Sequence, residues 1–114
     1  MSYKRTLRGV DFLIANELDL ARDEHGETFA SLHEGMAVLF EEAQEAQDES
    51  AEIDGFVSLL WDDVKADNAK GARMMAEELA SHAERLACEA IQVAAMALKF
   101  VDTVEEAEDD NSRD

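Results

Sequence analysis

The sequence contains no proline and only one cysteine, Cys88. Because proline is the strongest helix breaker, its absence favours long uninterrupted helices. A single cysteine can form neither an intramolecular disulfide nor a cysteine-rich zinc site, which is typical of a chain that works in the reducing cytosol. Cys88 lies among alanine and leucine residues, so we predict that it fills the core.

Long apolar runs and basic residues are also scarce. No stretch of about 18 apolar residues occurs, and the first residues lack the apolar segment and cleavage site of a secretory signal. We therefore expect a cytoplasmic protein that makes no contact with a membrane.

The chain contains ten Lys and Arg residues and 28 Asp and Glu residues, which give a formal net charge of -18. This charge repels the phosphate backbone, so we expect no direct binding to nucleic acid.

Apolar residues recur at steps of three and four along most of the chain, which predicts an all-α fold. At 114 residues, the chain has the size of one domain. We predict a single-domain bundle of about four helices over residues 1–104, with one long C-terminal helix. The predicted helices cover about residues 4–23, 29–48, 53–66 and 72–103. Residues 105–114 have no apolar periodicity and are predicted to form a disordered acidic tail.

Glycine and small polar residues mark the predicted helix boundaries. Gly26 is expected to end the first helix as a C-cap, and Thr28, in preference to Ser31, to cap the second helix. The polar segment QDESAEIDG is predicted to separate the second helix from the third, and residues 67–71 to form the next turn. We expect Trp61 to anchor the third helix against its neighbours.

An acidic constellation is the most informative feature for chemistry. Glu42 and Glu45, in LFEEAQEAQDE, lie three residues apart and project from one side of a helix, whereas Glu41 points further toward solvent. A second polar row on the long helix consists of Glu78, His82, Arg85, Glu89 and Gln92. If Glu89 faces Glu42 and Glu45, three carboxylates meet in one pocket, and their mutual repulsion demands a metal ion or protons.

The phrase LFEEAQE, followed later by EAIQVAAMALKF, is similar to the all-α nucleotide pyrophosphohydrolases of the MazG and dimeric dUTPase type. Their signature is EExxE on one helix and ExxD before an apolar run on another. Glu41, Glu42 and Glu45 match the first half. Glu89 and Gln92 match the second half, with glutamine in place of aspartate. The resemblance covers about residues 30–102.

Two features differ from the family pattern. Gln92 offers a neutral carbonyl oxygen, so it should bind magnesium less tightly than an aspartate does. In addition, 43 residues separate Glu45 from Glu89, which exceeds the usual spacing of the family. The segment EELASHA, with Glu77 and Glu78, is an alternative second half, in which a serine replaces the aspartate.

The resemblance implies a magnesium-dependent hydrolase that converts a nucleoside triphosphate into a monophosphate and pyrophosphate. The ion would polarise phosphoryl oxygens and generate the nucleophilic water. The implied partners are the nucleotide and further copies of the chain, with a dimer favoured. The implied site residues are Glu42, Glu45, Glu89 and Gln92 as metal ligands, Glu41 for the water, and Lys99 and Arg85 for phosphate.

Two non-catalytic interpretations stay open. A helical interaction protein, for example a phage-encoded accessory factor, explains every helix without a site, and the glutamine at position 92 favours it. The second is mimicry of nucleic acid by a surface with a net charge of -18. It would require carboxylates spaced along the surface like the phosphates of a nucleic acid, rather than gathered in one cleft.

Overall fold

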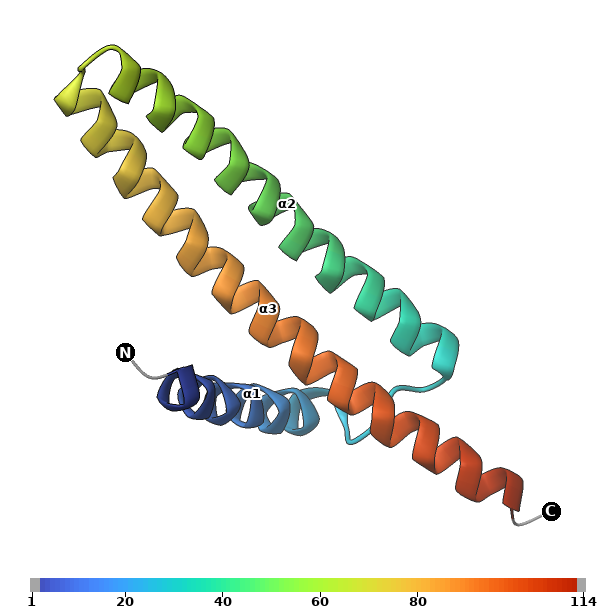
Figure 1. Ribbon diagram of the computed structural model, residues 1–114. Helices are drawn as coiled ribbons and strands as arrows, with labels where there is room; N and C mark the ends of the chain where they lie inside the picture. The colour runs from blue at the N-terminus through green and yellow to red at the C-terminus, as the bar shows by residue number, and fades with distance from the viewer. Residues whose placement is uncertain (1–2, 113–114) are drawn as a thin grey trace. The chain divides into compact units, whose positions relative to one another are not determined.

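The protein consists of three α-helices in a computed structural model that describes residues 3–112 (Figure 1). The helices are α1 (Tyr3–His25), α2 (Leu32–Lys65) and α3 (Ala69–Ser112). These residues form no strand, which confirms the predicted all-α class. α3 is the longest helix, at 44 residues. None of the helices within residues 3–112 combines the length and the apolarity that crossing a lipid bilayer requires.

The structure has three helices rather than the four predicted, because α2 continues through the polar segment that was expected to interrupt it. The partly buried residues Ala46, Ile53, Phe56 and Leu60 keep a helical spacing across this segment. No proline interrupts the backbone, and Gly55 costs a helix interior only about 1 kcal/mol. A polar segment therefore does not end a helix whose inward stripe keeps its period.

The C-terminal end of α3 also differs from the prediction. Residues 105–112, which were predicted to be disordered, continue the helix to Ser112. Residues 105–108 read EEAE, which favours helix, and Ala107 is partly buried, as is Val104 just before this segment. Low hydrophobicity alone therefore did not indicate disorder here. The last two residues of the predicted tail, 113 and 114, lie outside the described residues.

Local hydrogen bonds define the turns between the helices. Gly26 has a φ of 91° and its N–H donates to the Arg22 carbonyl at 2.8 Å, as the predicted C-cap requires. The predicted Thr28 cap is wrong, because the Ser31 hydroxyl accepts from the Glu34 N–H at 3.1 Å. The Glu34 carboxylate in turn accepts from the Ala30 N–H at 3.0 Å, one residue before the cap, which further fixes the start of α2.

The chain divides into two compact units, which are described separately. Unit 1 comprises the residues up to Ala43 together with those from Ala90 onward, and unit 2 comprises Gln44–Glu89. Unit 1 therefore contains α1, the start of α2 and the C-terminal part of α3. Unit 2 contains the rest of α2, the turn and the start of α3. The single domain expected over residues 1–104 stays a prediction.

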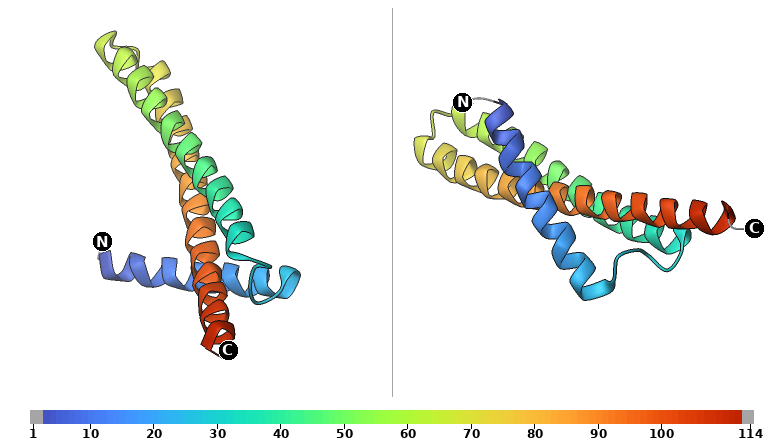
Figure 2. Two further views of the ribbon diagram at one scale, coloured as in Figure 1. Left: turned by 90° about the vertical axis from the view of Figure 1, so that its right-hand side faces the viewer. Right: turned by 90° about the horizontal axis from the view of Figure 1, so that it is seen from below.

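In unit 1, α1 lies across the C-terminal half of α3 (Figure 2). The core consists of Leu18 on α1 with Ala95 and Met96 on α3. An ion pair between Arg22 and Asp102 also joins the two helices. This pair raises the pKa of the Arg22 guanidinium, chiefly through its hydrogen bond to Asp102, so the guanidinium stays charged throughout the physiological range.

Unit 2 is an antiparallel helical hairpin formed by α2 and α3 (Figure 1). The Phe56 ring on α2 stacks on the His82 ring on α3, with centroids 4.9 Å apart. At the turn, Asp67 has a φ of 52° and the Asn68 side chain accepts a hydrogen bond from the Gly71 N–H at 3.0 Å. The turn thus begins where predicted, and α3 starts at Ala69, about one turn earlier than expected.

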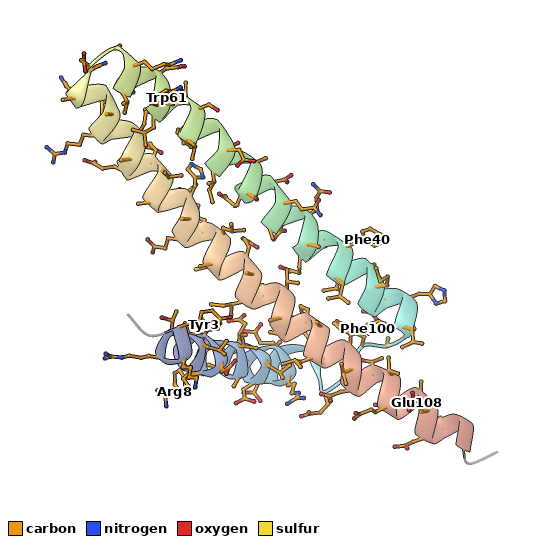
Figure 3. All side chains as sticks on the ribbon, viewed as in Figure 1. Tyr3, Arg8, Phe40, Trp61, Phe100 and Glu108 are labelled. Carbon is orange, nitrogen blue, oxygen red and sulfur yellow. The ribbon has the colours of Figure 1, made fainter. Side chains whose placement is uncertain are left out.

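Many large apolar side chains remain exposed. Trp61, which was expected to anchor a helix against its neighbours, is 58% exposed, and Phe40 is 68% exposed (Figure 3). Cys88 is exposed as well, so the prediction that it fills the core is wrong. Within the described residues, the buried hydrophobic side chains are those of the core already named. The fold therefore leaves apolar surface that a second molecule could cover.

Candidate functional site

Two glutamates meet across the hairpin of unit 2. One carboxylate oxygen of Glu45 on α2 lies within 4.8 Å of one of Glu89 on α3. The pKa of Glu45 is raised, first by its hydrogen bond to Glu89, then by partial desolvation and by repulsion from Glu89 and Asp48. Two carboxylates this close are stabilised when they share a proton or bind a cation. The predicted approach of Glu45 and Glu89 is therefore present in the structure.

Glu42 lies one turn before Glu45 on the continuous helix α2. Glu42 is partly buried, as its place at the margin of the apolar stripe predicts. Glu41, predicted to activate the water, is exposed on the same helix. Its exposure agrees with the predicted orientation and leaves its role a prediction.

Arg85 lies next to the acidic pair, four residues before Glu89 on α3. The two residues line a shallow cavity of about 260 Å³ in unit 2, together with Glu49 and Cys88. Residues four apart on a helix share one side, so Arg85 offers a guanidinium beside a candidate cation site. This arrangement suits contact with a phosphate group that the cation also binds.

His82 and Glu49 form a further polar contact in unit 2. His82 Nδ1 lies 2.8 Å from a carboxylate oxygen of Glu49, and its Nε2 lies 3.9 Å from Glu78. The His82 side chain is only 13% exposed. Glu49 was not singled out from the sequence, although its position four residues after Glu45 places it on the same side of α2. That spacing is the signal that could have found it.

Unit 1 contains a larger cavity, of about 800 Å³, between α1, the loop that follows it, α2 and α3. This volume lies within the usual range for small-molecule sites. Glu42 on α2 and Gln92 on α3 line the cavity, and so do the apolar side chains of Val38 and Met96. Lys99 also lines it. Three predicted site residues therefore belong to one cavity within unit 1.

Gln92 is held by a residue that the sequence did not suggest. Its Nε2 donates a hydrogen bond to a carboxylate oxygen of Glu17 on α1, at 2.6 Å. The amide oxygen of Gln92 is thereby turned away from Glu17, which leaves it able to face another group. Glu17 could not be assigned in advance, because no local pattern tells which face of α1 packs against α3.

Lys99 is almost completely buried, with 3% of its surface exposed. Its Nζ lies 4.6 Å from the centroid of the Phe29 ring. The backbone around this contact is fixed by Thr103, whose hydroxyl accepts from the Phe29 N–H at 3.0 Å and donates to the Lys99 carbonyl at 2.9 Å. Lys99 is thus a positioned charge in the cavity wall rather than a mobile surface lysine.

The predicted site residues therefore occur at two places. Glu45, Glu89 and Arg85 lie together in unit 2, whereas Gln92 and Lys99 line the cavity of unit 1. No protein family model, curated protein or solved structure matches this chain.

Proposed function

We propose that this protein is a magnesium-dependent nucleoside triphosphate pyrophosphohydrolase of the MazG-like type. The observation that carries the proposal is the close approach of the Glu45 and Glu89 carboxylates on two different helices. Two anionic side chains held this close destabilise each other at neutral pH unless a cation lies between them. Glu42, one turn before Glu45, adds a third carboxylate from the same helix.

The donor set fits magnesium. All three carboxylates offer oxygen atoms, which hard divalent cations prefer, and magnesium usually keeps several of its own waters. Glu45 and Glu89 would hold the ion, and Glu42, one turn before Glu45 on the same helix, would offer a further carboxylate oxygen. When bound, magnesium supplies a polarised phosphoryl oxygen and an activated water.

In the proposed reaction, water adds to the α-phosphorus of the nucleotide. The bond from that phosphorus to the oxygen bridging the α and β phosphates breaks, and pyrophosphate leaves with the bridging oxygen. The water proton passes to a carboxylate, for which Glu41 is our candidate. Arg85, which lines a cavity of unit 2 with Glu89, would neutralise charge on the departing phosphates.

Pyrophosphate release tests this proposal. Wild-type protein is incubated with a panel of nucleoside triphosphates and Mg²⁺ or Mn²⁺, in parallel with Glu42→Gln. The matched control is Glu52→Gln, which removes an exposed carboxylate from the same helix. We expect release to fall by about 100-fold or more in Glu42→Gln, since a metal contributes several kcal/mol to such reactions, and to persist in the control. Absence of release from every nucleotide would overturn the proposal.

Cation binding gives a second, independent measurement. The free Mn²⁺ signal in electron paramagnetic resonance titrations reports affinity without any nucleotide. We expect Glu45→Gln and Glu89→Gln each to weaken binding by at least about tenfold, and Glu52→Gln to leave it unchanged. Binding that survives both substitutions would show that the acidic pair does not hold the ion.

A second candidate function, a non-catalytic interaction protein, is favoured by one observation. Val57, Trp61 and Val64 follow each other at steps of four and three on α2, and they are 48%, 58% and 49% exposed. Such a stripe is typical of a helix that packs against another helix. Cation binding without release of pyrophosphate would favour this function over the hydrolase.

We also propose that this stripe associates with a second copy of the chain. Within residues 3–112, few hydrophobic side chains are buried, whereas domains of this size usually bury about two thirds of their surface on folding. Self-association would cover the Trp61 stripe and supply the missing burial. A homodimer is the simplest assembly that does so.

A further inference from the structure

The buried lysine in the cavity of unit 1 is the feature that carries a further inference. Lys99 lines the cavity and is 3% exposed. Its ammonium faces the ring of Phe29 at 4.6 Å, and the ion pairs found within residues 3–112 do not include Lys99. A buried ammonium is costly unless oxygen atoms accept its hydrogen bonds. A ligand in the cavity could supply that acceptor.

The cavity has two chemically different ends along α3. Gln92 and Lys99 are separated by seven residues, a rise of roughly 10 Å along a helix. Near Gln92 the cavity offers the carboxylate of Glu17, whereas near Lys99 it offers the Phe29 ring, with the Glu34 carboxylate on the neighbouring Ala30 N–H. The apolar side chain of Met96 lies between the two ends. This separation matches the span of a nucleotide from its phosphate to the far edge of its base.

The negative charge of the cavity wall indicates which part of a nucleotide the cavity binds. Glu24, Glu34 and Glu106 also line the cavity, so carboxylates outnumber the single ammonium of Lys99. A phosphate without a bound cation is repelled from such a cavity. A neutral planar base therefore suits the space beside Met96 better than a phosphate does. Lys99 is then too far along α3 to serve the phosphate contact that the sequence predicts.

We propose that Lys99 reads the nucleobase, by donating a hydrogen bond to a ring carbonyl oxygen at its far edge. This inference rests on the proposed nucleotide site. An ammonium has three donors and no acceptor. Guanine, hypoxanthine, uracil and thymine carry a carbonyl oxygen at that edge, whereas adenine and cytosine carry an amino donor there. The cavity thus selects 6-oxopurines and 4-oxopyrimidines against the corresponding amino bases.

The selectivity should be large, because rejection costs more than a lost contact. An amino base places its amino donor against the ammonium, where an oxo base supplies an acceptor. Sites built to hydrogen-bond one substrate group discriminate strongly against analogues that lack it. We expect each oxo base to bind at least about tenfold more tightly than its amino counterpart, which is the lower range for a hydrogen bond to a charged group.

Calorimetric titration with nucleoside monophosphates and Mg²⁺ tests the inference, because monophosphates have no bond for the proposed reaction to break. Inosine monophosphate is compared with adenosine monophosphate, and uridine monophosphate with cytidine monophosphate. The purine pair and the pyrimidine pair together show which class of base binds in the cavity. Within each class that binds, we expect the oxo base (inosine or uridine monophosphate) to bind more tightly than the amino base. Equal binding within both pairs, or no binding of any of the four, would overturn the inference.

The variant Lys99→Met tests the assigned residue, since it keeps the length of the side chain and removes the ammonium. We expect it to bind the oxo and amino bases equally. Lys65→Met is the matched control, because Lys65 also lies over an aromatic ring, 5.6 Å from Trp61, but is exposed in unit 2. Circular dichroism checks the fold of both variants. If Lys99→Met does not fold, the comparison of oxo and amino monophosphates on the wild-type protein still tests the inference.

The two proposals fail in distinguishable ways. Discrimination between inosine and adenosine monophosphates without pyrophosphate release from any triphosphate would retain the base-reading cavity and overturn the hydrolase. Pyrophosphate release with equal binding of oxo and amino bases would retain the hydrolase and overturn the role of Lys99.

Discussion

Gln92 on α3 donates a hydrogen bond from its side-chain nitrogen to a carboxylate oxygen of Glu17 on α1, at 2.6 Å. The MazG-like pattern that the sequence resembles has an aspartate at this position, and a second carboxylate would repel Glu17 rather than bind it. The glutamine therefore suits the packing of α1 on α3 in this chain. It need not indicate that a metal site has been lost.

Removal of this hydrogen bond should destabilise unit 1. Gln92→Met leaves the partly buried Glu17 without its donor, and we expect the free energy of unfolding to fall by about 1–2 kcal/mol. Urea denaturation followed by circular dichroism measures the change. The exposed Gln47 provides the control, since Gln47→Met should change stability by less than about 0.5 kcal/mol. Equal effects of the two substitutions would show that the contact adds no stability.

Two glycines of α2 should respond oppositely to alanine. A Cβ at Gly35 would lie 2.7 Å from the Phe100 ring and 2.8 Å from the Phe29 ring, whereas a Cβ at Gly55 meets nothing within 4 Å. We expect Gly35→Ala to destabilise by about 1–3 kcal/mol through overpacking. Gly55→Ala should stabilise by about 0.5–1 kcal/mol through helix propensity. Thermal unfolding of both variants tests this, and a stabilising Gly35→Ala would contradict the close packing.

Stability should depend on pH through Glu45. Its pKa in the folded state is raised above the ordinary value of 4.5. The folded protein therefore binds more protons than the unfolded chain in the window above pH 4.5, and this contribution to stability is lost as pH rises through the folded pKa. In a metal-free buffer with chelator, Glu45→Gln should be more stable than wild type near neutral pH but not near pH 4. Urea denaturation at several pH values measures this difference.

Glu52→Gln is the control for the pH experiment, because it removes an exposed carboxylate of the same helix. Its stability should follow that of wild type at every pH. Added Mg²⁺ should abolish the advantage of Glu45→Gln at neutral pH, since the cation relieves the repulsion that the substitution removes. A Glu45→Gln variant that follows wild type at every pH would indicate that the two carboxylates are fully screened by solvent.

Self-association should depend on the Trp61 stripe. We expect sedimentation velocity to give a dimer for wild type at micromolar concentration, and Trp61→Gln to shift the population toward monomer by at least about tenfold in dissociation constant. Phe12→Gln is the control, because Phe12 is 71% exposed on α1 but lies outside the stripe. A wild-type monomer at all concentrations, or equal effects of the two substitutions, would remove the proposed dimer.

Part of the candidate site could be predicted because it depends on helix geometry alone. Glu42 and Glu45 lie one turn apart in any α-helix, so their proximity follows from their spacing. Glu89 was placed opposite them from the polar row of the long helix, and the structure brings its carboxylate to Glu45. The partners Glu17 and Glu49 were missed, because each depends on how two helices face each other.

The helix boundaries show where reasoning from local patterns stops. The Gly26 cap was predicted, since a glycine before a helix-capping serine or threonine is a local signal. The break near residue 50 was predicted from polarity, but half-buried residues on both sides of it keep one inward stripe, and α2 continues. Lack of hydrophobicity after Thr103 likewise did not end α3.

The sequence by itself determined that this chain is helical, that its charge is strongly negative, and that Glu42 and Glu45 project together, because propensity, composition and helical period are local properties. Only the tertiary structure decided that Lys99 is buried against Phe29, that Gln92 binds Glu17, and that Trp61 and Cys88 stay exposed. Those outcomes depend on which faces of long amphipathic helices meet, and several registers bury similar apolar area, so the pattern of apolar residues does not select one.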